Sequence, residues 1–198
     1  MTKSKLYTAW VYLGAALALG FTLGFAQRYS TPPTPMVPTV APLTEQGIKD
    51  EVRKERQVKE QEERIERAAR AAEVVYISNG CSPKFARLTG IIARENGINP
   101  RVLAAVVVIE SSAHPDSVHQ GDVGLMQINT RVWKKYSQAE LKNPERNLRV
   151  GARILKNCIN RYGLVEGLHA YNGFGNPTDE YSTAVLTHAG MGGYNGNS

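Results

Sequence analysis

The sequence predicts a mainly α-helical globular domain that follows an apolar amino-terminal segment and a charged helix. The apolar run 102–109 begins two residues after Asn99-Pro100, a pair typical of a helix start. Asn143-Pro144 repeats that start before a second helical stretch, which Gly163 ends. Residues 45–73 carry eight basic and nine acidic side chains, spaced as helical pairs. Together these features favour an all-helical core over a sheet.

The first 29 residues are expected to form a membrane anchor or a signal segment. Residues 6–26 carry no charge, and at about 1.5 Å per helical residue they just span the apolar part of a bilayer. Lys3 and Lys5 precede this run, so the amino terminus should stay in the cytoplasm and the rest should be exported. We therefore expect a single-pass protein of the inner membrane with its globular domain in the periplasm.

Two alternatives remain open for this segment. Small residues at 24 and 26 have the spacing that a signal peptidase reads, so cleavage after Ala26 is not excluded. Ala16, Gly20 and Gly24 form a face of small residues through which two anchors could associate. The alternative is that these residues are simply small and that the face has no role in association.

A linker and a stalk are predicted between the anchor and the globular domain. Five of the ten prolines fall within residues 30–43, which predicts an extended linker. Residues 44–73 offer pairs such as Glu63 with Arg67 and Glu66 with Arg70, which favour a solvated helical stalk over a disordered charged linker. Its apolar positions keep no regular heptad, so a strong coiled coil is not expected.

Residues 74–198 are expected to fold as the functional domain. A helix should begin at Pro83 and stop at Gly97, and the next should run from Pro100 to Glu110. Residues 117–128 contain Gly and Asp and lack a clear period, which predicts a small hairpin or loop beside a cleft. About 120 residues suffice for one core.

Charge and composition exclude several classes of function. Residues 74–198 carry thirteen basic and nine acidic side chains, and this modest net charge of +4 favours approach to an anionic polymer such as a cell wall. No clustered stripe of Lys, Arg and aromatic residues indicates nucleic-acid binding. The four histidines have no spacing typical of a metal site, so no cofactor is expected.

Cys81 and Cys158 are the only cysteines. An exported domain meets an oxidising compartment, where such a pair tends to close into a disulfide. The alternative is two separately buried thiols, because the sequence gives no distance between them.

Glu110 is the strongest candidate for a catalytic residue. It closes the apolar run 102–109, and burial among apolar side chains raises the pKa of a carboxyl group. The end of a helix also opposes a negative charge. We therefore expect Glu110 to be an acid that stays protonated near neutral pH, with a structural hydrogen-bond role as the alternative.

Four blocks in the chain resemble, in order, the soluble lytic transglycosylase (SLT) family of the lysozyme-like superfamily. The first two are Glu110-Ser111-Ser112 and the Gly-Leu-Met-Gln-Ile block at 124–128. The third is Asn143-Pro144 with Asn147-Leu148 and Gly151, and the fourth is Ala170-Tyr171-Asn172-Gly173. Tyr181 and Val185 resemble the family's closing helix. The resemblance implies a goose-type lysozyme-like helical domain with a small hairpin region, here in a membrane-anchored form.

The resemblance also implies an activity and a set of site residues. It implies cleavage of the β-1,4 bond between N-acetylmuramic acid and N-acetylglucosamine in peptidoglycan, with a 1,6-anhydro product and Glu110 as the only catalytic acid. The residues that it implies for substrate binding are Ser111, Gln127, Tyr171, Asn172 and Tyr181. The alternatives are backbone capping for Gln127 and Asn172, and a core aromatic for Tyr181.

Two departures from the family pattern leave the substrate preference and the setting open. Asn129-Thr130 stand where many members place Pro, as in members that accompany conjugation or secretion machines and some phages, and the loop after Asn172 runs Gly-Phe-Gly-Asn-Pro. Phage lysis, phage entry and the assembly of an envelope machine all remain candidates. The competing activities are a hydrolysing muramidase, with Asp116 or Asp122 as its base, and a non-catalytic tether between membrane and wall.

Overall fold

The computed structural model describes residues 44–173 and 180–194. The expected anchor, its face of small residues and the proline-rich linker lie in residues 1–43, outside the described residues. None of the helices in the described ranges is both long enough and apolar enough to cross a membrane.

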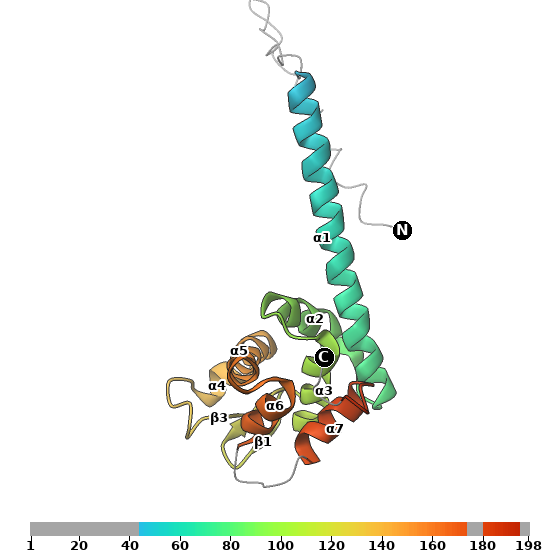
Figure 1. Cartoon of the computed structure of the whole chain (residues 1–198). Coiled ribbons are helices and arrows are strands. Elements are labelled where there is room, and N and C mark those ends of the chain that lie inside the picture. Colours follow the sequence, from blue (N-terminus) through green and yellow to red (C-terminus); the bar gives the residue numbers. More distant parts are fainter. Residues whose placement is uncertain (1–43, 174–179, 195–198) are drawn as a thin grey trace, which may run out of the picture. The chain divides into compact units, whose positions relative to one another are not determined.

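Helix α1 (Glu45–Ser78) shows that the charged segment is helical. Its first turn is capped by Thr44, whose hydroxyl accepts a hydrogen bond of 3.1 Å from the Gly47 N–H. The first turns of α1 extend away from the other helices, whereas its last turns lie against α2 (Ala86–Glu95) and α3 (Pro100–Ser111) (Figure 1). The helix continues to Ser78 and so crosses the expected boundary between residues 73 and 74.

The last turns of α1 belong to the core of the globular domain. A Cβ atom on Gly90 of α2 would lie 2.6 Å from the backbone of Ala68, so only glycine lets the two helices pack this closely. The Tyr76 hydroxyl forms a buried hydrogen bond of 2.8 Å with the hydroxyl of Thr89. Glu66 contacts Arg87 of α2 rather than the predicted partner Arg70. Side-chain burial therefore begins near residue 68.

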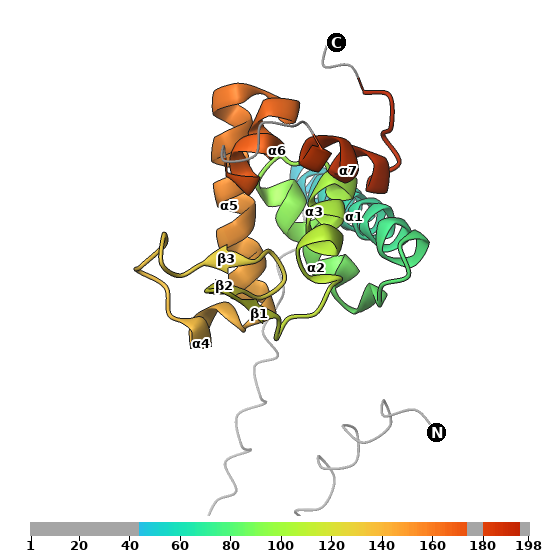
Figure 2. The same ribbon diagram turned by 90° about the horizontal axis from the view of Figure 1, so that it is seen from below.

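Helix α3 forms the centre of the core. Pro100 is its first residue, and the Asn99 side chain accepts a hydrogen bond of 2.9 Å from the Arg101 N–H, which confirms the predicted start. Its residues from Val102 to Val108 are all buried. Figure 2 shows α3 among α1, α2 and α7 (Glu180–His188). The predicted helix start at Pro83 takes the form of a short 3₁₀ turn, η1 (Pro83–Phe85), which leads into α2.

The segment predicted as a small hairpin or loop forms an antiparallel sheet of three two-residue strands. These are β1 (Val118–His119), β2 (Asp122–Val123) and β3 (Ile128–Asn129), with β2 in the middle. Asp122 pairs with Asn129 across the β2 and β3 strands. This register fixes where the polar side chains of the segment lie.

Helices α4 (Gln138–Leu141), α5 (Pro144–Tyr162) and α6 (Leu164–Asn172) complete the fold. Helix α5 begins after Asn143, which caps the Arg146 N–H at 2.9 Å, and ends before Gly163, as predicted. The sheet lies beside α5 (Figure 2). A Cβ atom on Gly151 would lie 2.4 Å from the sulfur of Met126, so this glycine lets the loop between β2 and β3 rest on the helix.

Candidate active site

A cleft of about 450 Å³ lies between the end of α3, the small sheet, α5 and α6. Glu110 of α3 and Asp122 of β2 bring two carboxyl groups to it. Val132, Trp133 and Ile154 form an apolar part of the wall. The cleft therefore combines acids with a surface on which a sugar ring can pack.

Glu110 is half-buried in the last turn of α3. Its Oε1 atom accepts a hydrogen bond of 2.5 Å from the Tyr181 hydroxyl. The helix ends immediately afterwards, because Ser112 and Ala113 both adopt positive φ angles, 49° and 63°. These two left-handed residues turn the chain away and leave Glu110 at the cleft.

Burial raises the pKa of Glu110 to about 7. The Tyr181 hydrogen bond acts in the opposite direction, because it favours the carboxylate, and the negative charge of Asp122 raises the pKa further. With this pKa, both the protonated and the ionised form of the carboxyl group are populated near neutral pH. It can both give and take a proton there.

Tyr181 and Tyr171 approach the site from the carboxyl-terminal helices. Burial and the nearby Glu110 charge raise the pKa of both phenols well above the ordinary value, so both remain donors. The Tyr171 hydroxyl donates a hydrogen bond of 2.8 Å to the Met126 carbonyl. Tyr171 therefore fixes the loop between β2 and β3, whereas Tyr181 acts on the acid itself.

Ser111, expected among the substrate-binding residues, lies behind the cleft wall. Its side chain is buried, and its hydroxyl donates to the Leu125 carbonyl at 2.9 Å and the Val107 carbonyl at 3.2 Å. It is not among the residues that line the cleft. Its contacts join α3 to the loop between β2 and β3, so Ser111 positions the wall of the cleft.

Gln127 and Asn172 both line the cleft. Gln127 has a φ of 42°, and its amide nitrogen donates to the carbonyls of Gly124 at 2.8 Å and Ser117 at 3.2 Å. The nitrogen of the Gln127 amide therefore caps backbone carbonyls, as the structural alternative proposed. Its amide oxygen is the atom left for a ligand. Asn172 is exposed at the end of α6, where its amide can reach a bound sugar.

Asn147 of α5 holds the loop between β2 and β3 in place. Its buried side chain accepts from the Met126 N–H at 2.8 Å and donates to the carbonyls of Val123 at 2.7 Å and Leu141 at 2.9 Å. A Cβ atom on Gly124 would lie 2.2 Å from the Asn147 amide nitrogen, so glycine is required there. The sequence contained this asparagine in the third family block, but its spacing alone did not identify these partners.

Of the two aspartates considered as a base, the structure brings Asp122 to the cleft and leaves Asp116 exposed outside it. Val132 and Trp133 were not predicted as site residues. The sequence feature that could have identified Trp133 is its position: it is one of two tryptophans and follows the Gly-Leu-Met-Gln-Ile block by a few residues. The pairing of Asp122 with Asn129 carries no comparable signal, because it depends on strand register.

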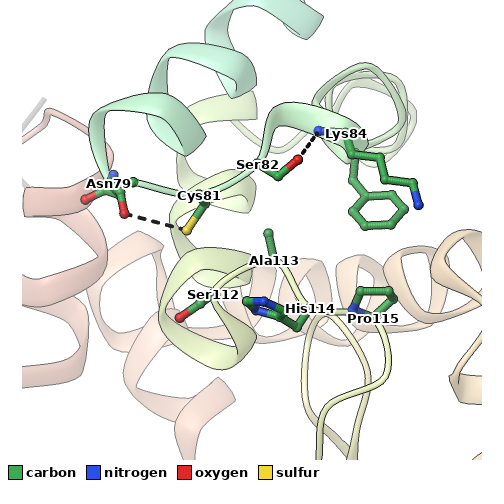
Figure 3. Close-up of a pocket in the computed structure, with 10 residues that line it drawn as sticks. Asn79, Cys81, Ser82, Lys84, Ser112, Ala113, His114 and Pro115 are labelled. Atoms are coloured by element: carbon green, nitrogen blue, oxygen red, sulfur yellow. Dashed lines mark hydrogen bonds between the residues drawn. The ribbon is translucent and has the colours of Figure 1, made fainter.

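Cys81 and Cys158 are separate free thiols, so the structure contains no disulfide between them. They line different hollows: Cys158 faces the cleft, and Cys81 faces a second hollow of about 400 Å³. Figure 3 shows this second hollow between the chain segment of Asn79–Lys84 and that of Ser112–Pro115. No carboxyl group lines it, so the acid chemistry belongs to the cleft with Glu110.

Glu110 and Tyr181 are groups at the site that can take part in proton transfer. Within the described ranges, no three His, Cys, Asp or Glu side chains gather in a way that would hold a metal ion. The site offers an acid with a pKa of about 7, a phenol that donates a hydrogen bond to it, and two amide side chains that line the cleft. This set is suited to protonating a leaving oxygen.

Comparison with known proteins finds similarity to transglycosylases. The transglycosylase SLT domain model matches residues 88–185. An endo-type membrane-bound lytic murein transglycosylase A of Cronobacter sakazakii is 35% identical over 86 residues, which cover 37% of this chain and 41% of that protein. A transglycosylase of Enterobacteria phage PRD1 is 34% identical over 110 residues, which cover 52% of this chain and 42% of the phage protein. The chain spans about two fifths of the length of these relatives.

Proposed function

The chain belongs, through residues 88–185, to the transglycosylase SLT domain family of the lysozyme-like superfamily, and on this premise we propose that it is a peptidoglycan lytic transglycosylase. It cleaves the β-1,4 bond between N-acetylmuramic acid and N-acetylglucosamine and leaves a 1,6-anhydro end on the muramic acid. The observation that carries the proposal is Glu110, half-buried in a cleft with a pKa of about 7.

Glu110 serves twice in the proposed reaction. Tyr181 donates to Oε1, so the proton of the acid resides on Oε2, from which it passes to the glycosidic oxygen as the C1–O bond breaks. The resulting carboxylate then takes the proton of the muramic C6 hydroxyl, and O6 bonds to C1. The acid is left protonated, no water is consumed, and the N-acetyl group of the substrate stabilises the cationic centre in between.

The remaining cleft residues bind and orient the strand. The amide oxygen of Gln127 and the amide of Asn172 bind acetamido groups of the strand, and Trp133 packs against a sugar ring; the support is that all three residues line the cleft. Tyr171 keeps the loop between β2 and β3 in register through its bond to Met126. Ser111 is a positioning residue for the same loop.

A hydrolysing muramidase is the second candidate, and Asp122 is the observation that favours it. This carboxylate lines the same cleft as Glu110 and raises its pKa. In a hydrolase, Asp122 would activate a water molecule on the opposite face of the sugar. The products distinguish the two activities, because hydrolysis leaves a reducing end in place of the anhydro end.

We further propose a single-pass protein of the inner membrane that acts in the periplasm. Residues 1–29 would anchor it, residues 30–43 and 44–73 would form the linker and the stalk, and residues 74–198 would form the catalytic domain. The name of the Cronobacter sakazakii relative, membrane-bound, supports the anchor. Phage lysis or entry and the assembly of an envelope machine are the settings that such a protein suits.

The test of the proposed function is the Glu110→Gln variant of the full chain, assayed for lysis of peptidoglycan and for binding to it. We expect lysis to fall roughly 10²- to 10⁴-fold while binding is retained, because only the proton donor is lost. Glu166→Gln is the matched control, since Glu166 is exposed and lies outside the cleft. Unchanged lysis by Glu110→Gln would refute its role as the acid, whereas a wild type that binds peptidoglycan without lysing it would favour the tether.

A further inference from the structure

Two basic side chains contact the ring of Tyr136, which follows the cleft residues Val132 and Trp133 in the chain. The Nζ atom of Lys135 lies 5.1 Å, and the Cζ atom of Arg146 lies 5.3 Å, from the centre of the Tyr136 ring. These cations come from different segments, the loop after β3 and the first turn of α5. We call the five basic residues of the segment 131–146 the Tyr136 cluster: Arg131, Lys134, Lys135, Lys142 and Arg146.

The acidic side chains of the same segment do not neutralise the cluster. Only two carboxylates occur between residues 131 and 146, and both are engaged. Glu140 accepts from the Ser137 N–H and hydroxyl, each at 2.9 Å, and adds a longer-range attraction to Arg146. Glu145 pairs with Arg149 at 2.9 Å. Across the described part of the chain, no cation of the cluster forms an ion pair within 4.0 Å.

Two apolar residues connect the cluster to the cleft. Val132 and Trp133 line the cleft and lie in sequence between the cations Arg131 and Lys134. Val132 is 71% exposed, the highest value among the exposed large hydrophobic residues of the described chain. An exposed methyl surface flanked by cations suits a ligand that carries both methyl groups and carboxylates.

We propose that the Tyr136 cluster binds the carboxylates of the peptide stems that project from the glycan strand held in the cleft. This inference rests on the proposed function. Each muramic residue carries, through its lactyl group, a short peptide with alanyl methyl groups and free carboxylates. A strand that lies against Trp133 extends such stems over the edge of the cleft, where the cluster meets them. Exposed charge contacts are individually weak, so the cluster selects stem-bearing strands more than it adds affinity.

The experiment compares two substrates: glycan strands that carry stems, and the same strands after an amidase has removed the stems. The full chain in mild detergent is assayed as wild type and as the Lys134→Gln, Lys135→Gln double variant. We expect kcat/KM of the variant to fall about 3- to 10-fold on stem-bearing strands and to stay within twofold on bare strands. The matched control is Arg53→Gln, Lys54→Gln, which removes the same charge from exposed positions of α1.

Four outcomes would overturn the inference. Equal losses on both strands would assign the cluster to glycan binding or to the fold, and an equal loss in the control would reduce the effect to net charge. No loss on stem-bearing strands, or a loss confined to binding of anionic phospholipid vesicles, would exclude stem recognition. In these cases the wild type still cleaves bare strands, whereas a wild type that cleaves neither substrate would instead refute the proposed function.

Discussion

The hydroxyl of Tyr181 donates a hydrogen bond of 2.5 Å to Oε1 of Glu110, across a separation of 71 residues. The bond connects the last helix of the described chain to the end of the central one. It lowers the pKa of Glu110, against burial and Asp122, which both raise it. The pKa of Glu110 is therefore set by contributions of opposite sign, and the contributions of Tyr181 and Asp122 can each be removed by a substitution.

Tyr181→Phe should raise the pKa of Glu110 above about 7, because it removes the hydrogen bond that favours the carboxylate. The proposed reaction needs a protonated acid, so activity should be lost as the pH rises through this pKa. The alkaline limb of the kcat/KM profile should therefore move to higher pH, while the maximal rate falls roughly tenfold through poorer orientation. Rates measured from pH 5 to 9 check both effects, and an unmoved limb would contradict this role for Tyr181.

Asp122→Asn should move the same limb in the opposite direction. Removing the Asp122 charge lowers the pKa of Glu110, so the alkaline limb shifts to lower pH. In a lytic transglycosylase the rate at the optimum should stay within about tenfold of wild type, because Asp122 is not needed as a base. A collapse of activity at every pH would favour the hydrolytic mechanism.

Glu110→Gln should change the pH dependence of stability. Burial holds the pKa of Glu110 at about 7 in the fold, against an ordinary value of 4.5. Between these values the folded chain keeps a proton that the unfolded chain has released, so wild-type stability falls as the pH rises through this window. Relative to Glu110→Gln, the wild type should lose about 2–3 kcal/mol between pH 4.5 and 7.5. Urea unfolding of both proteins measures this difference, and parallel curves would contradict the raised pKa.

Asn147→Ala should destabilise the domain by about 3–5 kcal/mol, because it leaves three buried backbone groups without their partner. Asn160→Ala is the control on the same helix, at an exposed position. Thermal unfolding should show a large loss for the first variant and almost none for the second. Equal stability of the two variants would mean that Asn147 does not support the loop between β2 and β3.

Local sequence signals predicted the helices of the globular domain well. The Asn-Pro pairs at 99–100 and 143–144 place a side-chain cap directly before a proline, and both helices begin there. Gly163 follows the last residue of α5, as its position indicated. These features depend only on neighbouring residues, so the sequence alone was sufficient.

Features that depend on tertiary packing were not predictable in the same way. The charged helix continues into the core because Ala68 and Gly90 allow α1 and α2 to approach closely, and charge counts do not report that contact. Glu66 contacts Arg87 on another helix instead of Arg70 on its own. The two cysteines line different hollows, although their number was consistent with a disulfide.

The candidate site was predictable in its residue types and less so in its contacts. Glu110 follows a run of apolar residues, which indicated burial and a raised pKa. The approach of Tyr181 to Glu110 was inferred only through the family resemblance, since 71 residues separate them. The place of Asp122 in the cleft depends on a strand register that no sequence period indicated.

The most direct test of the central claim is mass spectrometry of the fragments that the full chain releases from purified peptidoglycan. We expect muramic ends in the 1,6-anhydro form, one water lighter than reducing ends, and no such fragments from Glu110→Gln. Anhydro ends can arise only if the muramic C6 hydroxyl, rather than water, completes the reaction. Reducing ends from the wild type would contradict the account and would assign Asp122 as the base of a hydrolase.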